Sequence, residues 1–226
     1  GDNVGDVAGM GADLYESYVG SIISASALGV SAFGGDVKGM AVPLLLASLG
    51  IILSIIGTAF VRTGESIDQK QLLKALSKGT NFSAIAIAIL SLPVVYYVLD
   101  GNLGLYAAIV SGLLAGVLIG FSTEYFTSDT YKPYKPTKKL AETSETGSAT
   151  IIIGGLGLGM KSTALPIVIV AISVLVSYFA SGGAASASMG LYGIALSAVG
   201  MLSTLGITLA TDAYGPVADN AGGIAQ

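Results

Sequence analysis

The sequence contains no cysteine and no histidine, and it carries little charge of either sign. Without cysteine, disulfide bonds, zinc–thiolate sites and thiol nucleophiles are excluded. Without histidine, any acid–base chemistry must use carboxylates, lysine, tyrosine or a metal-bound water. Only 11% of the residues are charged, against about 25% in a soluble domain. The net charge of −4 and the lack of a concentrated basic groove argue against nucleic acid as a partner.

Apolar residues take the place of the missing charges. They make up 53% of the chain, and the mean hydropathy is +0.79. Several uncharged stretches reach about 18 residues or more, which is long enough to cross a bilayer. The 32 glycines, with many alanines and serines, suit close packing between membrane helices. We therefore predict an all-α, polytopic transmembrane helical bundle whose surroundings are a lipid bilayer.

Six membrane spans are expected, at about 6–29, 40–62, 80–99, 104–126, 163–180 and 190–212. Cytoplasmic connections at 63–79 and 127–162 join them, and within the second we expect 149–160, too short to span alone, to be an interfacial or re-entrant piece. Gly112, Gly116 and Gly120 form a tandem GxxxG pattern, which predicts a close-packing helix face. We interpret residues 1–226 as a central fragment of a single transmembrane domain.

Basic residues indicate the orientation of these spans. If the Asp2 end lies inside the cell, nine of the ten lysines and arginines fall on the inner side, and only Lys38 falls outside. This is the positive-inside pattern. An even number of spans also returns the chain to the inner side. The C-terminal stretch TDAYGPVADNAGG is therefore predicted to lie on the same cytoplasmic face as the N-terminal DNVGD.

The first 18 residues, GDNVGDVAGMGADLYESY, hold four of the 14 acids in the chain. At about 100° per residue, Asp2, Asp6, Asp13, Glu16 and Ser17 share one helical stripe about 100° wide and about 20 Å long. A favourable acidic helix start explains Asp2 and Asp6, but not Asp13 and Glu16, which lie further in. An ionisable residue inside a membrane is costly, so transport is the default hypothesis for these two. The alternative is a structural pair with a cation from another helix.

The last motif repeats the chemistry of the first. Asp212 and Asp219 are seven positions apart and face the same way if the turn stays helical, although the Gly-Pro pair between them makes this register less secure. Asp2 and Asp6 can converge with them at the cytoplasmic mouth of two packed helices. Four carboxylates need a compensating charge, and Mg²⁺ supplies it while bridging carboxylates to substrate phosphates. A carboxylate pair could then orient a water for in-line attack on phosphorus.

The stretch DNVGDVAGMGADLYESY closely resembles the signature of the membrane-integral pyrophosphatases, which couple pyrophosphate hydrolysis to Na⁺ or H⁺ pumping. TDAYGPVADNAGGIA resembles the motif at the end of that family's eleventh helix. The segment from TEYFTSDTYKP to GMKSTALP is similar to its long cytoplasmic connection. The resemblance covers nearly the whole chain. It implies a sixteen-helix fold, of which this chain is about a third, a homodimer, and a prokaryotic cell inner membrane with the catalytic motifs on the cytoplasmic side.

The resemblance also implies roles for individual residues. Asp6 and Asp219 would hold the nucleophilic water and contribute to metal binding. Asp2 and Asp212 would bind Mg²⁺ and, through it, pyrophosphate, with Asn220 assisting. K⁺ and Na⁺ are candidate activators. The residues implied as the ion gate are Asp13, Glu16 and Ser17.

Glu16 bears on which ion is pumped. Within the family an acid at its position goes with Na⁺ pumps, but also with some bacterial H⁺ pumps. Position 20 is a glycine, and no acid follows before Asp36. We therefore favour Na⁺ over H⁺. The alternative function is a secondary ion transporter or channel without hydrolysis, which leaves the four-aspartate cluster without a role. By itself, the fragment is expected to be inactive.

Overall fold

The computed structural model describes residues 2–63, 69–127 and 136–225, without the side chains of Asp2, Gln69, Lys70, Leu72 and Leu73. Within these ranges all regular secondary structure is helical, which confirms the all-α prediction. The first four helices are α1 (Asp2–Ala32), α2 (Val37–Thr58), α3 (Gln69–Val98) and α4 (Leu103–Thr127). After them come α5 (Pro136–Glu142), the short 3₁₀ helix η1 (Thr143–Thr146), α6 (Ser148–Ala180), α7 (Ala187–Leu202), α8 (Leu205–Asp212) and α9 (Tyr214–Ala225).

Four helices in the described ranges are long and apolar enough to cross a membrane. They are α2, residues 74–98 of α3, α4 and α6. A fifth span is formed if α7 and the stretch from Leu205 to Ala225 are taken together, with a bend of 44° between them. The sixth expected span is α1, which is 31 residues long but is more polar than the others because of its acids and serines. Its composition, and not its length, separates it from the other five.

Two helices extend beyond the predicted spans. α6 runs without a break from Ser148 to Ala180. Residues 149–160 are therefore continuous with the following span and do not form a separate re-entrant piece, whereas their interfacial position stays a prediction. Lys161 changes the local hydropathy, but it leaves the backbone hydrogen bonding of a helix intact. α3 begins at Gln69, inside the connection expected at 63–79, because lysine, glutamine and leucine are good helix formers.

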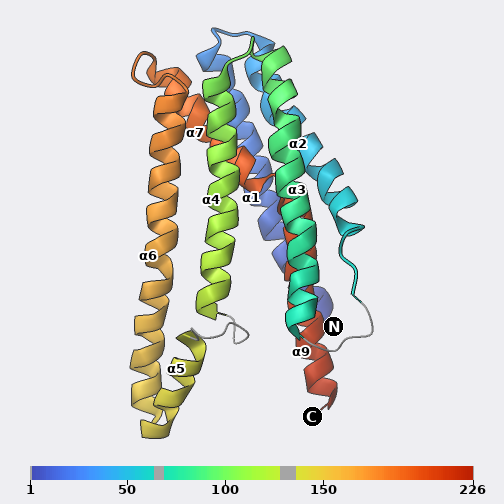
Figure 1. Ribbon diagram of the computed structural model, residues 1–226, viewed down its shortest axis with the longest axis vertical. Coiled ribbons are helices and arrows are strands. Elements are labelled where there is room, and N and C mark those ends of the chain that lie inside the picture. Colours follow the sequence, from blue (N-terminus) through green and yellow to red (C-terminus); the bar gives the residue numbers. More distant parts are fainter. Residues whose placement is uncertain (1, 64–68, 128–135, 226) are drawn as a thin grey trace.

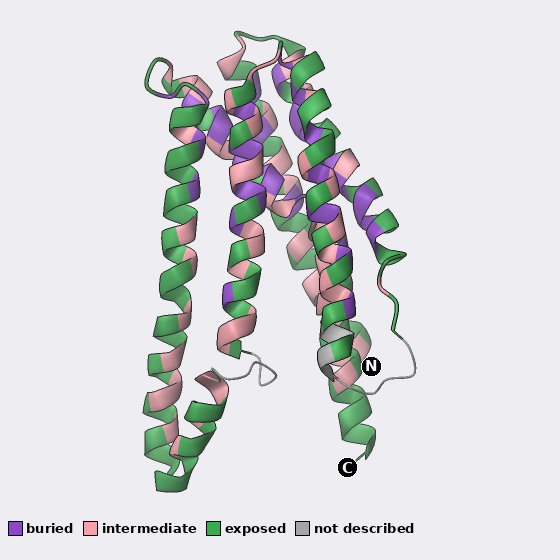
Figure 2. Cartoon of the chain, viewed as in Figure 1, coloured by how far each residue is buried: buried purple, intermediate pink, exposed green. Residues whose placement is uncertain are grey.

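The helix α7 lies at the centre of the bundle and contacts α1, α2, α4 and α6. Its fully buried residues Tyr192, Leu196 and Val199 belong to the main apolar core, together with residues of α1, α2, α3 and α4. Figure 2 shows the buried residues concentrated in the upper part of the bundle, away from both chain ends. The lower ends of the helices are therefore less tightly packed within this chain.

Glycines allow several helices to approach at backbone distance. A Cβ atom at Gly112 of α4 would overlap the backbone carbonyl of Ser197 in α7, and one at Gly116 would lie 3.1 Å from Met201. Nothing lies within 4 Å of a Cβ at Gly120. The predicted close-packing face is therefore confirmed for the first two glycines of the repeat and does not extend to the third. Such contacts between small residues are the usual basis of membrane-helix packing.

A tyrosine hydrogen bond compensates for the proline inside α2. The N–H of residue 43 would ordinarily bond to the carbonyl of Gly39, but Pro43 has no N–H. The buried Tyr192 hydroxyl of α7 instead donates a hydrogen bond of 2.8 Å to that carbonyl. The Tyr192 ring also makes an edge-to-face contact with Phe33, with centroids 5.7 Å apart. Tyr192 therefore fastens α7 to the α1–α2 region.

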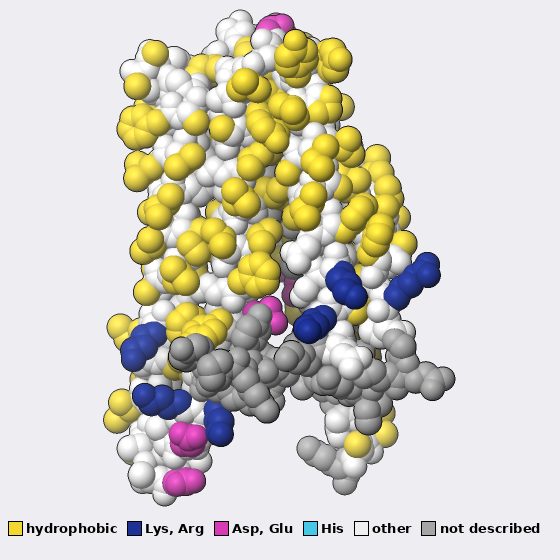
Figure 3. Space-filling view, in the orientation of Figure 1, with side chains coloured by type: hydrophobic (Ala, Val, Ile, Leu, Met, Phe, Trp, Pro, Cys, Tyr) yellow, Lys and Arg dark blue, Asp and Glu magenta, His cyan; other side chains and the backbone are white. Residues whose placement is uncertain are grey.

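The surface is that of an integral membrane protein. Apolar side chains cover most of the height of the face seen in Figure 3, and the lysines and arginines on that face gather near its lower end. At the opposite end, Lys38 forms an ion pair with Asp100 at 2.7 Å and lies 3.6 Å from Asp36. This distribution agrees with the positive-inside orientation inferred above.

Candidate active site

The two acidic motifs lie at the same end of the bundle. α1 begins and α9 ends in the lower part of Figure 1, where most basic residues also lie. α1 contacts both α8 and α9. The chain thus returns to its starting end and brings the helices of DNVGD and TDAYGPVADN against each other, although these motifs are about two hundred positions apart. The geometry meets the condition on which the predicted carboxylate cluster depends.

The acids of this end differ in exposure. Asp6 on α1 and Asp219 on α9 are exposed, and so is Asn220. Asp212 is the last residue of α8 and is partly buried. Asp2 opens α1, and its side chain lies outside the described part of the chain. Among the described residues, no three acidic side chains lie close enough to hold a metal ion, so the four-aspartate metal site stays a prediction.

The turn between Asp212 and Asp219 is nearly helical. α8 ends at Asp212 and α9 starts at Tyr214, so the interruption is confined to Ala213, whose backbone is itself right-handed helical. Pro216 lies in the first turn of α9, where a missing N–H costs little. The Gly-Pro pair is therefore accommodated just after the interruption.

The predicted gate residues occupy the uncovered face of α1. Asp13, Glu16 and Ser17 are all exposed, while the adjacent Tyr18 is buried. The Tyr18 hydroxyl donates a hydrogen bond of 3.2 Å to the carbonyl of Ala47 in α2. This contact helps fix the rotation of α1, so that its buried side meets α2 and α7 and its acidic side points away from them.

The uncovered face continues along the whole of α1. Its exposed positions, spaced three or four apart, are Asp6, Gly9, Asp13, Glu16, Gly20, Ser24, Ala27 and Ser31. Acids occupy the half near the N-terminus and small residues the other half. The single acidic stripe predicted from the sequence is confirmed for its four described side chains, since Asp6 and the three gate residues are all exposed along a continuous helix.

Comparison with known proteins identifies the family of this chain. The family model described as inorganic H⁺ pyrophosphatase matches residues 1–226, the whole chain. The chain belongs to the H⁺ pyrophosphatase family.

The curated relatives of this chain include two kinds of pump. A protein of Clostridium tetani, 54% identical, and one of Bacteroides thetaiotaomicron, 52% identical, are each provisionally named a K⁺-stimulated pyrophosphate-energized sodium pump. A protein of Methanosarcina mazei, 45% identical, is named a K⁺-insensitive pyrophosphate-energized proton pump. All three matches cover 100% of this chain and 32–33% of the relative. The chain therefore spans about a third of the length of these relatives.

One polar residue at this end of the bundle was missed by the sequence reasoning. The side-chain oxygen of Asn3 is buried, and it has no hydrogen-bond partner among the described residues. A buried polar atom is normally satisfied, so this oxygen is available to a further group at the same end as the acidic motifs. Its position between Asp2 and Asp6 was the available signal, since an amide inside a run of spaced aspartates supplies the same kind of oxygen donor.

Proposed function

We propose that the complete protein is a Mg²⁺-dependent membrane pyrophosphatase that hydrolyses pyrophosphate to two phosphates and pumps ions. The observation that carries the proposal is the single exposed face of α1. Asp6 lies at the end where α1 meets α8 and α9, and Asp13 and Glu16 follow on the same face, about 10 and 15 Å further along the axis. One unbroken helix thus connects a candidate hydrolytic centre with ionisable groups at membrane depth.

The donor set at this end fits magnesium. Mg²⁺ prefers oxygen ligands. The acids of α1, α8 and α9 supply only oxygens, as does the Asn3 side-chain oxygen, which has no partner among the described residues. Because the described acids do not form a complete cluster by themselves, we propose that Asp2 and parts of the protein beyond this chain complete the site. When bound, Mg²⁺ neutralises phosphate charge and lowers the pKa of a bound water.

The side chains of this chain have distinct proposed tasks. Asp6 and Asp219, exposed on two different helices, hold the attacking water between carboxylate oxygens, and one of them accepts its proton, since a carboxylate can act as a general base. Asp2 and Asp212 hold the substrate end of the site, with Asn220 donating or accepting a hydrogen bond. Asp13, Glu16 and Ser17 form the ion gate.

We propose Na⁺ as the pumped ion, with K⁺ as a candidate activator. Glu16 provides the carboxylate in the membrane, and residue 20 is a glycine that leaves open space beside it. The two sodium-pump relatives share 52% and 54% identity with this chain, against 45% for the proton pump of Methanosarcina mazei. The proposal also includes a homodimer in a prokaryotic inner membrane, with 1–226 as the central part of one transmembrane domain and the acidic motifs in the cytoplasm.

Replacing one catalytic carboxylate by its amide tests the chemistry. In the full-length protein in membranes, Asp6→Asn and Asp219→Asn should each lower pyrophosphate hydrolysis by about 10² or more, the range that general acid–base groups supply. Asp100→Asn is the matched control, because Asp100 is an exposed acid in the connection between α3 and α4, and that connection lies at the opposite end of the bundle. Normal phosphate release from both site variants, at normal expression, would overturn the assignment.

Transport assays decide the ion and the competing function. Pyrophosphate-driven ²²Na⁺ uptake into vesicles that persists with a protonophore indicates Na⁺ pumping. Pyrophosphate-driven acidification without Na⁺ uptake would show that the ion is H⁺. Uptake that follows an imposed ion gradient and ignores pyrophosphate would instead support a secondary transporter or channel.

A further inference from the structure

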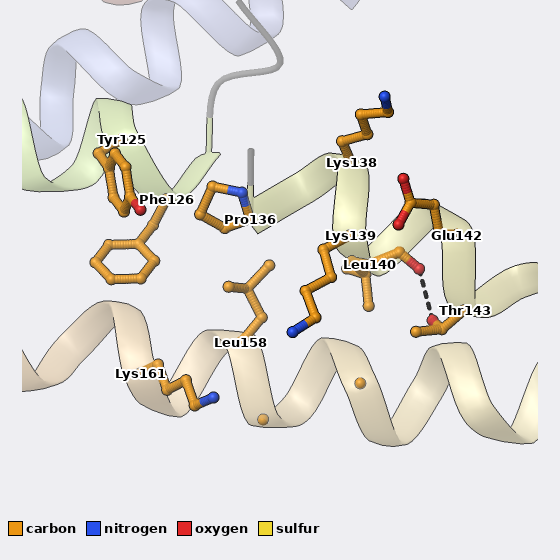
Figure 4. A pocket seen from close by; sticks show the side chains of 12 residues that line it. Tyr125, Phe126, Pro136, Lys138, Lys139, Leu140, Glu142, Thr143, Leu158 and Lys161 are labelled. Carbon is orange, nitrogen blue, oxygen red and sulfur yellow. Dashed lines mark hydrogen bonds between the residues drawn. The ribbon is translucent and has the colours of Figure 1, made fainter. Parts of the chain in front are cut away.

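The inner end of the bundle contains a groove with no role in the proposed hydrolysis. It lies between the end of α4, α5 and the first half of α6, and has a volume of about 750 Å³. Its apolar lining includes Phe126, Leu140 and Leu158, and Tyr125 lies beside them. Figure 4 shows Phe126, Leu140 and Leu158 on three different elements around the same space. An apolar floor therefore lies beneath the charged rim.

The rim of this groove is basic. Lys138, Lys139 and Lys161 line it against a single acid, Glu142. None of the three lysines forms an ion pair with a described residue. In Figure 4, Lys139 extends from α5 toward α6, and Lys161 lies along α6 with its nitrogen toward Lys139. Lys138 extends from the face of α5 that points away from α6. Lys139 and Lys161 are thus the pair best placed to hold one anionic group between the two helices.

The depth of the groove follows from the length of α6. At about 1.5 Å per residue, its 33 residues extend about 50 Å, whereas the hydrocarbon core needs only about 20 residues. Counting about 20 residues back from Ala180 brings the inner boundary of the hydrocarbon to Lys161. Gly154 and Leu158 then lie about 5 to 10 Å beyond that boundary. The groove is therefore level with the phosphates of the inner lipid leaflet.

We propose that this groove binds the headgroup of an anionic phospholipid of the cytoplasmic leaflet. The phosphodiester lies between the ammonium groups of Lys139 and Lys161, and the acyl chains pass along the exposed apolar face of α6. Free inorganic phosphate carries the same anionic charge, but it has no apolar group that could pack against the floor of the groove. Basic pockets between membrane helices on the cytoplasmic side have the right character for such lipids. The proposal needs the membrane orientation but not the hydrolytic activity.

Lipid titration of the full-length protein tests the site. Binding of phosphatidylglycerol to the protein in neutral micelles is measured by native mass spectrometry. Each lysine near anionic lipid contributes about fivefold in affinity, so Lys139→Gln with Lys161→Gln should weaken binding about 25-fold. Lys139→Arg with Lys161→Arg keeps both charges and should bind as the unchanged protein does. Lys139→Gln alone, an exposed single replacement, should weaken binding about fivefold if the double variant fails to fold.

The matched control is Lys74→Gln with Lys78→Gln, two exposed lysines at the same end of the bundle but on α3. This variant should change phosphatidylglycerol binding less than about twofold. Phosphatidylcholine should bind weakly to every variant. The proposal is wrong if the groove variants bind as tightly as the unchanged protein, if the control pair loses as much affinity, or if millimolar inorganic phosphate displaces the lipid.

Discussion

Replacing Tyr192 by phenylalanine removes one hydroxyl and leaves the rest of the core in place. The ring is fully buried, and its edge-to-face contact with Phe33 does not need the hydroxyl. The lost interaction is the 2.8 Å hydrogen bond to the carbonyl of Gly39. Because Pro43 cannot donate to that carbonyl, the substitution removes its compensating donor. The cost is therefore that of an uncompensated buried acceptor in addition to one lost hydrogen bond.

The loss of stability caused by Tyr192→Phe can be bounded from measurements in protein cores and between membrane helices. An unsatisfied buried group costs about 1–3 kcal/mol in a protein core, while hydrogen bonds between membrane helices average about 0.6 kcal/mol and reach about 1.7. We expect Tyr192→Phe to lower the free energy of unfolding by about 1 kcal/mol, a roughly fivefold change in the equilibrium. The measurement is an SDS titration of the full-length protein in mixed micelles, followed by circular dichroism.

A double-mutant cycle isolates the reason for the effect. Pro43→Ala restores an N–H that can bond to the Gly39 carbonyl within α2. In that background the same tyrosine substitution should cost less than half as much, with a coupling of about 0.5 kcal/mol or more. Equal costs of Tyr192→Phe in both backgrounds would refute the compensation argument, even if Tyr192 proves important for packing.

Two further substitutions test the packing of the bundle. Gly112→Ala should destabilise the full-length protein by about 2 kcal/mol or more, because a new methyl in a tightly packed contact forces the backbone apart. Thermal unfolding measures this loss. Gly120→Ala should show a smaller change, because a Cβ at Gly120 meets nothing within 4 Å. Lys38→Met should weaken the outer end only slightly, because its pair with Asp100 is exposed. The difference between Lys38→Met and the unchanged protein should vanish in high salt, and a salt-independent loss would contradict an exposed ion pair.

The helices that cross the membrane could be predicted from the sequence because hydropathy is a local property. The expected spans at 40–62 and 104–126 lie within a few residues of α2 and α4. The N-terminal ends of α3 and α6 were harder to predict. The charged connection before α3 and Lys161 in α6 mark a change from lipid to water, but they do not end a helix. Amino-acid composition indicates where a helix leaves the bilayer, whereas the end of the helix depends on backbone hydrogen bonding.

The bend between α7 and α8 was not predicted from the sequence. No proline occurs near Ser203, and the local sequence favours a continuous span. In the structure, a Cβ on Gly50 of α2 would overlap the carbonyl of Ser203, and the Ser203 hydroxyl donates to the carbonyl of Gly200 at 2.5 Å. The interruption thus lies at a close contact with α2, and periodicity along one chain segment cannot reveal such a contact.

The candidate site was predictable as a set of residues on shared faces, but not as a metal cluster. The stripe through Asp6, Asp13 and Glu16 follows from the helical repeat alone, and the return of Asp212 and Asp219 to the same end follows from an even number of crossings. Convergence of side chains to ligand distance depends on rotamers and on neighbouring helices. The chain matches only about a third of the length of its relatives, so helices outside this chain are proposed to supply some of those neighbours.

The hydrogen bond between Tyr192 and Gly39 also sets an order of events during synthesis. Its partners are separated by 153 positions, which a ribosome translates in about 8 to 30 s. Throughout that interval the carbonyl of Gly39 lacks the donor that it has in the finished fold. The final hydrogen bonding of α2 therefore depends on a helix that is made much later.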